Sequence, residues 1–438
     1  MIVMKFGGTS VGSALRIREV VGIVKSQLIN DPIVVVSALG GVTDALIDIS
    51  KQAAAGKDVS LQLEQLVKRH YDALNELKLD RGIISEEMDK LGKLIGEIFM
   101  LGELTPRNLD LLMSFGERMS ARIVAGCMRS FGLDATAYDA YDIGMITTSN
   151  FGDADINAYT YQKIRKSLAG KKGIPVITGF LGKSKEGDIT TLGRGGSDYT
   201  ASIVGAAVGA KEIQIWTDVN GIMTADPKIV KAARSIDEVS YKEAIELAML
   251  GAKVLHPKTI LPAVENNIPV RILNTFNPQH KGTLVLNNSG TGSRVTSITY
   301  KKHIVAISIS SPGRIEVRDF LRRVIDVFAK HDVPVEIISN SKTGVSVTIE
   351  ERHETVQLMA DLRAIGNVEA KSNRARVSLV GNDLLYMPDI LQNMYSSLKS
   401  IEIEMISSSM SKKNKSVVIE EKYADKAVKR LHTTFFSR

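Results

Sequence analysis

The sequence has 438 residues, of which 44% are hydrophobic and 24% are charged, and its 56 basic and 49 acidic residues leave a net charge of +7. Such a composition is typical of a globular protein, and roughly 100–200 residues per domain predicts about two to four domains. We do not expect a membrane protein, because no apolar run could span a bilayer and the opening MIVMKFGG lacks the basic region of a signal peptide. We do not expect a nucleic-acid-binding protein either, because the lysine runs have no interleaved aromatic residues.

Cysteine and histidine are informative through their scarcity. The single cysteine, Cys127, excludes an internal disulfide framework and favours a reducing compartment, so we expect a cytoplasmic protein. The seven histidines are scattered without the spacing of metal ligands, and the sequence therefore predicts no protein metal site.

The first part of the chain alternates β-rich runs with helical patterns. Five runs are apolar on both faces, as the strands of a buried parallel sheet are. They are residues 2–6, 33–37, 174–180, 212–217 and 269–273.

Between residues 60 and 130 the apolar period changes to 3.6, which predicts a helical insertion. One predicted helix face carries Leu63, Leu66, Val67, Tyr71, Leu74 and Leu77, and another carries Leu91, Leu94, Ile95, Ile98 and Phe99. We interpret this insertion as a cap over the functional site.

A run of turn-forming residues at 287–294, NNSGTGSR, predicts a domain boundary. Beyond it we expect a strand at 304–310, a helix at 318–331, strands at 335–339 and 344–350, and a helix at 353–365. The same order recurs with strands at 376–381, 401–407 and 415–421, which indicates an internal repeat of about 70 residues.

Each repeat lacks the last strand of a βαββαβ ferredoxin-like fold. Residues 368–372 can supply it for the first repeat, and residues 295–300 can supply it for the second. Residues 295–300 could instead pair with the first part of the chain, but the number of otherwise unpaired strand edges favours the exchange between repeats.

The sequence does not match two familiar nucleotide-binding motifs. A Walker A loop ending in Gly182-Lys183-Ser184 would need glycine in place of Ile177, and a dinucleotide fingerprint starting at Gly193 would need glycine in place of Asp198. Any phosphate site must therefore use another kind of loop.

Three other loops follow predicted strands. In residues 5–10, KFGGTS, paired glycines, a lysine and a following helix could cradle phosphate, although GG also occurs in plain strand-helix turns. In residues 191–198, TLGRGGSD, Arg194 could bind a carboxylate through two hydrogen bonds. Asp198 in the same loop could belong to the functional site or merely cap the helix that follows. Residues 217–228 could contact a nucleotide or form an ordinary turn.

Glu117 lies inside a helical pattern and could bind an ammonium group, although a surface salt bridge is the more common role. No Ser/His/Asp or Cys/His arrangement is evident. This suits a carboxylate acceptor, which is ionised at neutral pH and needs no general base.

Five motifs occur in the order typical of one family. They are KFGGTS at 5–10, SFGE at 114–117, TTLGRGGSD at 190–198, TDVNGI at 217–222 and GAKVLHP at 251–257. Over nearly its whole length the sequence resembles the aspartokinases of the amino-acid kinase superfamily, and its repeats resemble their paired ACT domains.

The resemblance implies an α/β fold, with a three-layer αβα sandwich followed by two ferredoxin-like ACT domains. The implied domains are a kinase domain at 1–286, a first ACT domain at 303–374, and a second at 375–438 completed by residues 295–300. It also implies a monofunctional enzyme, because no homoserine dehydrogenase segment follows the repeats before Arg438.

The implied reaction is phosphorylation of the side-chain carboxylate of L-aspartate by ATP, with Mg²⁺ bound mainly through the phosphates. This would be the first step toward lysine, threonine and methionine. The implied catalytic residues are Lys5 and Asp198, and the implied aspartate-binding residues are Thr43, Glu117, Arg194, Gly195, Gly196 and Ser197. The implied nucleotide-binding residues are Lys5, Phe6, Gly7, Gly8, Thr217, Asp218, Met223, Lys228, Lys253 and Val254.

Paired ACT domains imply feedback control by an amino acid, most often lysine, and a homodimer or dimer of dimers. The implied effector residues are Asp319, Val335, Glu336, Asn340 and Ser341. The chain departs from the family where Met223 replaces a frequent tyrosine, Lys228 a frequent arginine, and Asp319 a glycine common in lysine-sensitive members.

Other functions remain open at this stage. Glutamate 5-kinase and UMP kinase share the sandwich but lack tandem ACT units. The alternative from a different class is an amino-acid-sensing regulator with an inactive kinase domain. The presence of Lys5, Arg194 and Asp198 argues against it, because an inactive site has no reason to keep all three.

Overall fold

The computed structural model describes residues 1–251, 255–287, 294–311, 313, 316–408 and 412–437. Contacts between residues divide the chain into two compact units. The first unit is Met1–Ile222, Ser235–Tyr241 and Val254–Ser289, and the second is Met223–Arg234, Lys242–Lys253 and Gly290–Arg438. Helix α8 (Tyr241–Met249) starts in the first unit and continues in the second. No helix in the described part of the chain is both long and apolar enough to cross a membrane.

The first unit contains an eight-stranded sheet in the order β3-β5-β2-β1-β8-β10-β11-β9. Its strands are β1 (Ile2–Phe6), β2 (Pro32–Val36), β3 (Ala135–Tyr138), β5 (Ile174–Thr178), β8 (Ile213–Thr217), β9 (Glu238–Ser240), β10 (Val270–Asn274) and β11 (Thr283–Leu286). All neighbours are parallel except β10 and β11. The five strands predicted from the sequence are confirmed as β1, β2, β5, β8 and β10.

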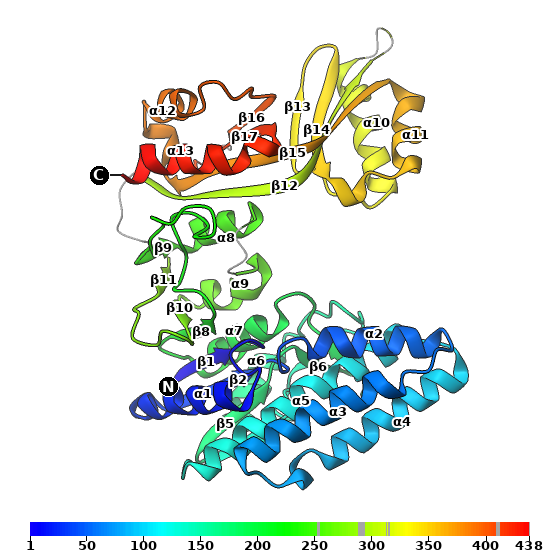
Figure 1. The fold of residues 1–438 in the computed structure, drawn as a ribbon, viewed down its shortest axis with the longest axis vertical. Helices are drawn as coiled ribbons and strands as arrows, with labels where there is room; N and C mark the ends of the chain where they lie inside the picture. Colours follow the sequence, from blue (N-terminus) through cyan, green and yellow to red (C-terminus); the bar gives the residue numbers. More distant parts are fainter. Residues whose placement is uncertain (252–254, 288–293, 312, 314–315, 409–411, 438) are drawn as a thin grey trace. The chain divides into compact units, whose positions relative to one another are not determined.

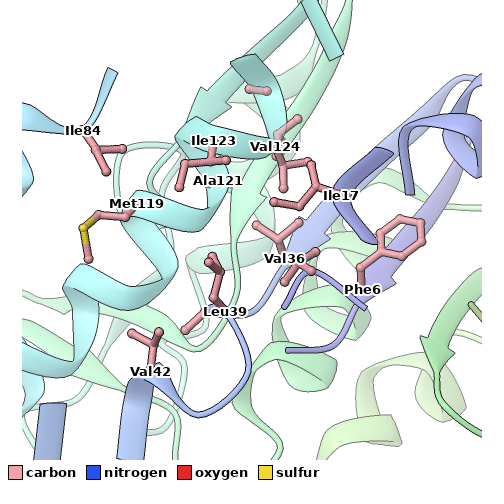
Figure 2. Packing of buried hydrophobic residues seen from close by; sticks show 14 of the residues in the cluster. Phe6, Ile17, Val36, Leu39, Val42, Ile84, Met119, Ala121, Ile123 and Val124 are labelled. Atoms are coloured by element: carbon pink, nitrogen blue, oxygen red, sulfur yellow. The ribbon is translucent and has the colours of Figure 1, made fainter. Parts of the chain in front are cut away.

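Helices cover both faces of this sheet, as its doubly buried strands require. Figure 2 shows the packing on one face, where Phe6 and Val36 from the sheet meet Ile17 of α1 and Val124 of α5. On the other face α7 contacts β1, and α6 and α9 pack against α7. These helices are α1 (Ala14–Ser26), α5 (Pro106–Ser130), α6 (Thr160–Leu168), α7 (Gly196–Val208) and α9 (Pro257–Glu265). A small second sheet contains β4 (Ile146–Thr147), β6 (Leu181–Ser184) and β7 (Ile189–Thr191).

The predicted helical insertion is present as α3 (Ser60–Leu77), α4 (Ser85–Leu101) and the start of α5. Figure 1 shows these helices running alongside α2 (Val42–Ala54). The predicted apolar faces are buried or half-buried with one exception, because Phe99 is 45% exposed. Phe99 lies about 80° around the helix from Leu91, at 100° per residue, so it falls outside the buried stripe.

The second unit contains a six-stranded sheet in the order β13-β14-β12-β15-β17-β16. Its strands are β12 (Arg294–Ser310), β13 (Ile337–Asn340), β14 (Gly344–Glu350), β15 (Asn367–Asn382), β16 (Met405–Ser408) and β17 (Asn414–Glu420). Its helices are α10 (Val317–Lys330), α11 (Val356–Ile365), α12 (Ile390–Ser397) and α13 (Ala424–Phe436). One apolar core lies under α10 and α11, and another lies under α12 and α13.

Strands β12 and β15 pair with each other through both halves of this sheet (Figure 1). The stretch Ile304–Ser310 pairs along Asn367–Arg374, whereas Arg294–Lys301 pairs along Arg376–Asn382. Residues 295–300 therefore lie beside the strand of the second repeat. The apolar pattern predicts each half of β12 and β15 as a separate strand, but each is continuous, with register shifts in their pairing after Val295 and between Lys301 and Ala306.

The segment Met223–Arg234 groups with the second unit for a specific reason. Ala225 and Val230 are buried in the same apolar core as Ile298 of β12 and Val428 of α13. The backbone oxygen of Thr224 also accepts a hydrogen bond of 2.9 Å from the Ile298 amide. This association could not be read from the sequence, since the segment is far from both partners along the chain.

Candidate active site

A cavity of about 310 Å³ lies at the carboxyl ends of the central strands of the first unit. It is lined by Lys5, Gly8, Ser37, Ala38, Leu39, Gly40, Gly41, Thr43, Asp44, Glu117, Phe180, Gly193, Gly195, Gly196, Ser197 and Asp198. β1 lies between two parallel neighbours, β2 and β8, and ligand sites in open α/β sheets form at such strand ends.

Glycines allow the loops after β1 and β2 to touch at the cavity. The Gly40 amide donates a 3.0 Å hydrogen bond to the Gly8 oxygen. A Cβ atom on Gly8 would lie only 3.1 Å from the Ala38 oxygen and 3.2 Å from the Gly40 Cα. Gly8 is thus needed for the backbone approach itself, whereas a Cβ atom on Gly7 would make only ordinary contacts, the nearest at 3.5 Å.

Two helices point their N-termini at the cavity. Helix α2 begins after Gly41 and helix α7 after Gly195, and both glycines have left-handed backbones, with φ of 80° and 72°. Neither helix start has a side-chain cap, while first-turn residues Thr43 and Ser197 line the cavity. Uncapped N–H groups and the helix dipoles make this end of the cavity attractive to anions.

Lys5 and Asp198 meet in the cavity. Lys5 is the next-to-last residue of β1 and Asp198 lies in the first turn of α7, and their Nζ and Oδ1 atoms are 2.6 Å apart. Both side chains are largely buried, at 12% and 16% exposure. Among the described residues that line the cavity, Lys5 is the only one with a cationic side chain. Asp198 therefore pairs with a lysine ammonium, and it does not cap the helix, the simpler role that its position also allowed.

Glu117 brings a second carboxyl group to the cavity from α5. Its side chain is buried, and Oε2 has no hydrogen-bond partner among the described residues. Burial raises the pKa of Glu117 to about 8, opposed by backbone hydrogen bonds at Ala38 and Glu117 and by the charge of Lys5. The surface salt bridge considered for Glu117 is thus excluded, and a buried carboxyl with free lone pairs suits a cationic ligand.

The raised pKa of Glu117 makes a stability prediction. Between pH 4.5 and about 8 the folded chain keeps a proton that the unfolded chain has lost, so stability falls as pH rises through this window. Glu117→Gln removes the ionisable group, and urea unfolding should show the variant gaining stability over the unmodified protein from pH 5 to pH 8. Glu97→Gln, on the exposed side of α4, should show no such trend. Parallel pH profiles for both variants would contradict the burial of an ionisable Glu117.

Several predicted site residues do not line the cavity. Arg194 is exposed, between Gly193 and Gly195, which both have positive φ. Thr217 and Asp218 follow β8 and hydrogen-bond to each other at 3.1 Å.

The other predicted nucleotide contacts divide into three groups. The Phe6 side chain is fully buried and stacks on Trp216, with ring centroids 5.8 Å apart, so only its backbone could meet a nucleotide. Met223 and Lys228 belong to the second unit. The predictions for 253 and 254 fall outside the described residues.

The predicted effector residues lie near one edge of the sheet in the second unit. Asp319 is in the first turn of α10, and Val335 and Glu336 directly precede the edge strand β13. Asn340 ends that strand and Ser341 follows it, and both are exposed.

Glu336 differs from Asp319, which pairs at 3.4 Å with the exposed Arg318 beside it, because the cationic partners of Glu336 belong to strands of the sheet. Its carboxylate lies 2.8 Å from Arg376 Nη1 and also pairs with Lys301. Arg376 is almost fully buried, so this ion pair belongs to the interior of the sheet.

The loop after β2 was missed by reasoning from residues alone. Residues 37–41, SALGG, contribute five of the cavity-lining residues. The signal was available, because small residues and paired glycines directly follow a predicted strand, as they do in KFGGTS.

Comparisons with known proteins agree with this geometry. Residues 1–274 match the amino acid kinase family, and residues 377–435 match an ACT domain. The chain is 37% identical to aspartokinase 1, chloroplastic, of Arabidopsis thaliana, over 99% of this chain and 80% of that protein. It is 32% identical to lysine-sensitive aspartokinase 3 of Escherichia coli (strain K12), over 100% of this chain and 99% of that protein.

Solved structures give the same result. The crystal structure of E. coli aspartokinase III in complex with aspartate and ADP matches with a TM-score of 0.84 and 30% identity, over 100% of both chains. The complex of that enzyme with lysine and aspartate matches with a TM-score of 0.83 and 31% identity, over 100% of this chain and 99% of that one.

Proposed function

The chain belongs to the aspartokinase family and is an aspartate kinase with an ACT regulatory domain, and on this basis we propose that the cavity of the first unit holds L-aspartate during phosphoryl transfer from ATP. The observation that carries the proposal is the pairing of two features in one cavity. Glu117 offers a buried carboxyl whose Oε2 has no hydrogen-bond partner among the described residues, and the Lys5–Asp198 pair lies beside two open helix N-termini.

The three charged groups of L-aspartate each have a counterpart there, and Lys5 is the counterpart of the side-chain carboxylate. Glu117 receives the ammonium group. The start of α7, with Ser197 and backbone amides of Gly195 and Gly196, receives the α-carboxylate, and Arg194 on the same loop turns in to pair with it. Thr43, at the start of α2, contributes a hydroxyl.

The proposed reaction needs no general base. An oxygen of the ionised side-chain carboxylate attacks the γ-phosphorus of ATP, the bond to the bridging oxygen breaks, and ADP leaves with that electron pair. The product is the mixed anhydride 4-phospho-L-aspartate. Lys5 stabilises the charge on the transferred group, and Asp198 keeps the lysine ammonium in place.

The nucleotide lies along the glycine-rich loop after β1 in this proposal. Gly7 and Gly8 present backbone amides to the phosphates, and Thr217 and Asp218 follow the neighbouring strand β8. Among the described residues no group of three or more His, Cys, Asp or Glu could hold a metal ion. The residues present therefore fit a Mg²⁺ ion held mainly by the phosphates, where it would neutralise their charge.

We further propose a domain organisation and a mode of control. The kinase domain is 1–286, and the ACT domains are 303–374 and 375–438, the second completed by 295–300. Lysine is the proposed effector, supported by the lysine-sensitive relative and by the relative solved with lysine. A homodimer is proposed because the edge strands β13 and β16 are unpaired on their outer sides in the described sheet, with Ile338 and Ile406 about half exposed.

The reaction is tested by measuring ADP release from Mg-ATP with L-aspartate, L-glutamate or UMP as acceptor. We expect turnover with aspartate, and trapping of the acyl phosphate as a hydroxamate by hydroxylamine. ADP release with glutamate or UMP but not with aspartate would contradict the proposed substrate.

Feedback control is a separate prediction. L-lysine should lower aspartate-dependent turnover in a concentration-dependent way, and D-lysine at the same concentrations should not. If L-lysine has no effect while L-threonine or L-methionine inhibits, lysine is not the effector, and the replacement at Asp319 would be the first position to study.

A further inference from the structure

Asp110 of α5 is a buried carboxylate that none of the roles above explains. It is only 1% exposed and accepts three hydrogen bonds from two loops. The Thr191 amide donates at 2.8 Å, the Thr191 hydroxyl at 3.0 Å, and the Gly152 amide at 3.0 Å. Burial raises the pKa of Asp110, because removing a carboxylate from water costs free energy, and the three hydrogen bonds oppose this effect.

Asp110 is not needed to start its own helix. The N-cap of α5 is Thr105, whose side chain accepts from the Asn108 amide at 3.1 Å, and Pro106 occupies the first helical position. Asp110 is a full turn further on, where the backbone amides already bond within the helix. Its carboxylate is therefore directed at the two loops and not at the helix.

The loops that Asp110 holds lead directly to the cavity. Thr191 ends β7, and the next residues, 192–195, form the glycine loop that opens α7 and lines the cavity. Gly152 precedes Asp153, whose Oδ1 would lie 2.5 Å from a Cβ on Gly193 and which pairs with Lys258 at 2.9 Å. The loop containing Gly152 thus packs against the glycine loop at Gly193.

Helix α5 also carries Glu117, seven residues after Asp110. Seven residues are close to two turns, so both side chains leave the same side of the helix about 10.5 Å apart along its axis. Helix α5 therefore carries both Glu117, which is proposed to bind the ammonium group of aspartate, and Asp110. Asp110 in turn holds Thr191, next to the loop that is proposed to bind the α-carboxylate.

We propose that Asp110 is a positioning residue that fixes the distance between Glu117 and the glycine loop at residues 192–195, and so sets the aspartate site for its substrate. The inference rests on the proposed function of that cavity. Asp110 touches no substrate; it acts through Thr191 and Gly152.

Asp110→Ala should raise the KM for aspartate about 10-fold, the effect of losing one or two net hydrogen bonds, while the KM for ATP and kcat change less than about threefold. Asp110→Asn should recover most of this loss, because its amide oxygen can accept both backbone N–H groups and its NH₂ group can donate to Thr191. Asp89→Ala, at an exposed position on α4, is the matched control and should behave like the unmodified protein. An unchanged KM for aspartate in Asp110→Ala, or no recovery in Asp110→Asn, would overturn the proposal.

A second measurement does not depend on turnover. In hydrogen exchange of the unliganded protein, peptides covering 150–154 and 189–195 should exchange faster in Asp110→Ala, while those covering β1 and β2 should not change. If Asp110→Ala does not fold, Thr191→Val removes only the hydroxyl donor and should raise the KM for aspartate about threefold. Unchanged exchange in these loops would refute the tether, whereas absence of aspartate turnover by the unmodified protein would refute the proposed function instead.

Discussion

Replacing Lys5 with methionine is expected to lower kcat by about 10²–10³-fold, the usual cost of removing one group that stabilises transition-state charge. Lys5 supplies the only cationic side chain that the described part of the chain places in the cavity lining, and methionine keeps the length of the side chain but removes the charge. The variant also leaves Asp198 without its 2.6 Å partner, so a second carboxylate faces the incoming phosphates. Steady-state ADP release at saturating aspartate and Mg-ATP measures this effect.

The control for Lys5 is Lys51→Met, on the exposed side of α2, the helix whose N-terminus lines the cavity. It should keep kcat within about twofold, because Lys51 is not among the residues that line the cavity and most surface substitutions leave stability nearly unchanged. Circular dichroism and melting temperature should show both variants folded. A folded Lys5→Met protein with normal kcat would exclude Lys5 from transition-state stabilisation.

Replacing Glu117 with glutamine is expected to raise the KM for aspartate by roughly 10- to 100-fold, the range for a lost hydrogen bond to a charged group. Glutamine has nearly the same shape, but its amide cannot lose a proton, whereas a bound ammonium group favours the ionised form of the Glu117 carboxyl. The KM for ATP should stay unchanged, because Glu117 is proposed to contact only the amino acid. Initial rates with each substrate varied in turn separate these constants.

Glu97→Gln makes the same chemical change at an exposed position of α4 and should not alter either constant. A rise in the KM for ATP equal to that for aspartate would mean that Glu117→Gln disturbs the whole cavity and does not act as an ammonium ligand. The stability measurement separates these two cases. Glu117→Gln should gain stability at pH 8 while its aspartate binding weakens, whereas a variant with a disturbed cavity should lose both.

The central sheet could be predicted because its strands are buried on both faces and so consist of continuous apolar runs. Such runs define β1, β2 and β8 from local sequence alone. Lys5 and Asp198 could be suspected from their loops, but their contact joins residues 193 positions apart. Residue patterns cannot supply that distance, and the family resemblance did.

Other features depend on tertiary contacts that local patterns do not record. The continuity of β12 could not be foreseen, because Lys301, Lys302 and His303 interrupt its apolar pattern where the register shifts. Asp110 could not be foreseen either, because an aspartate in an amphipathic helix is ordinarily exposed. Its role depends on a hydrogen bond to Thr191, 81 residues away.

The most direct test of the central claim, that this cavity is the aspartate site, is a crystal structure of the protein with L-aspartate and ADP. We expect the aspartate ammonium within hydrogen-bond distance of Glu117 Oε2, its α-carboxylate at the start of α7, and its side-chain carboxylate toward Lys5. Aspartate bound outside this cavity, or inside it with a carboxylate facing Glu117, would show that the proposed site is wrong.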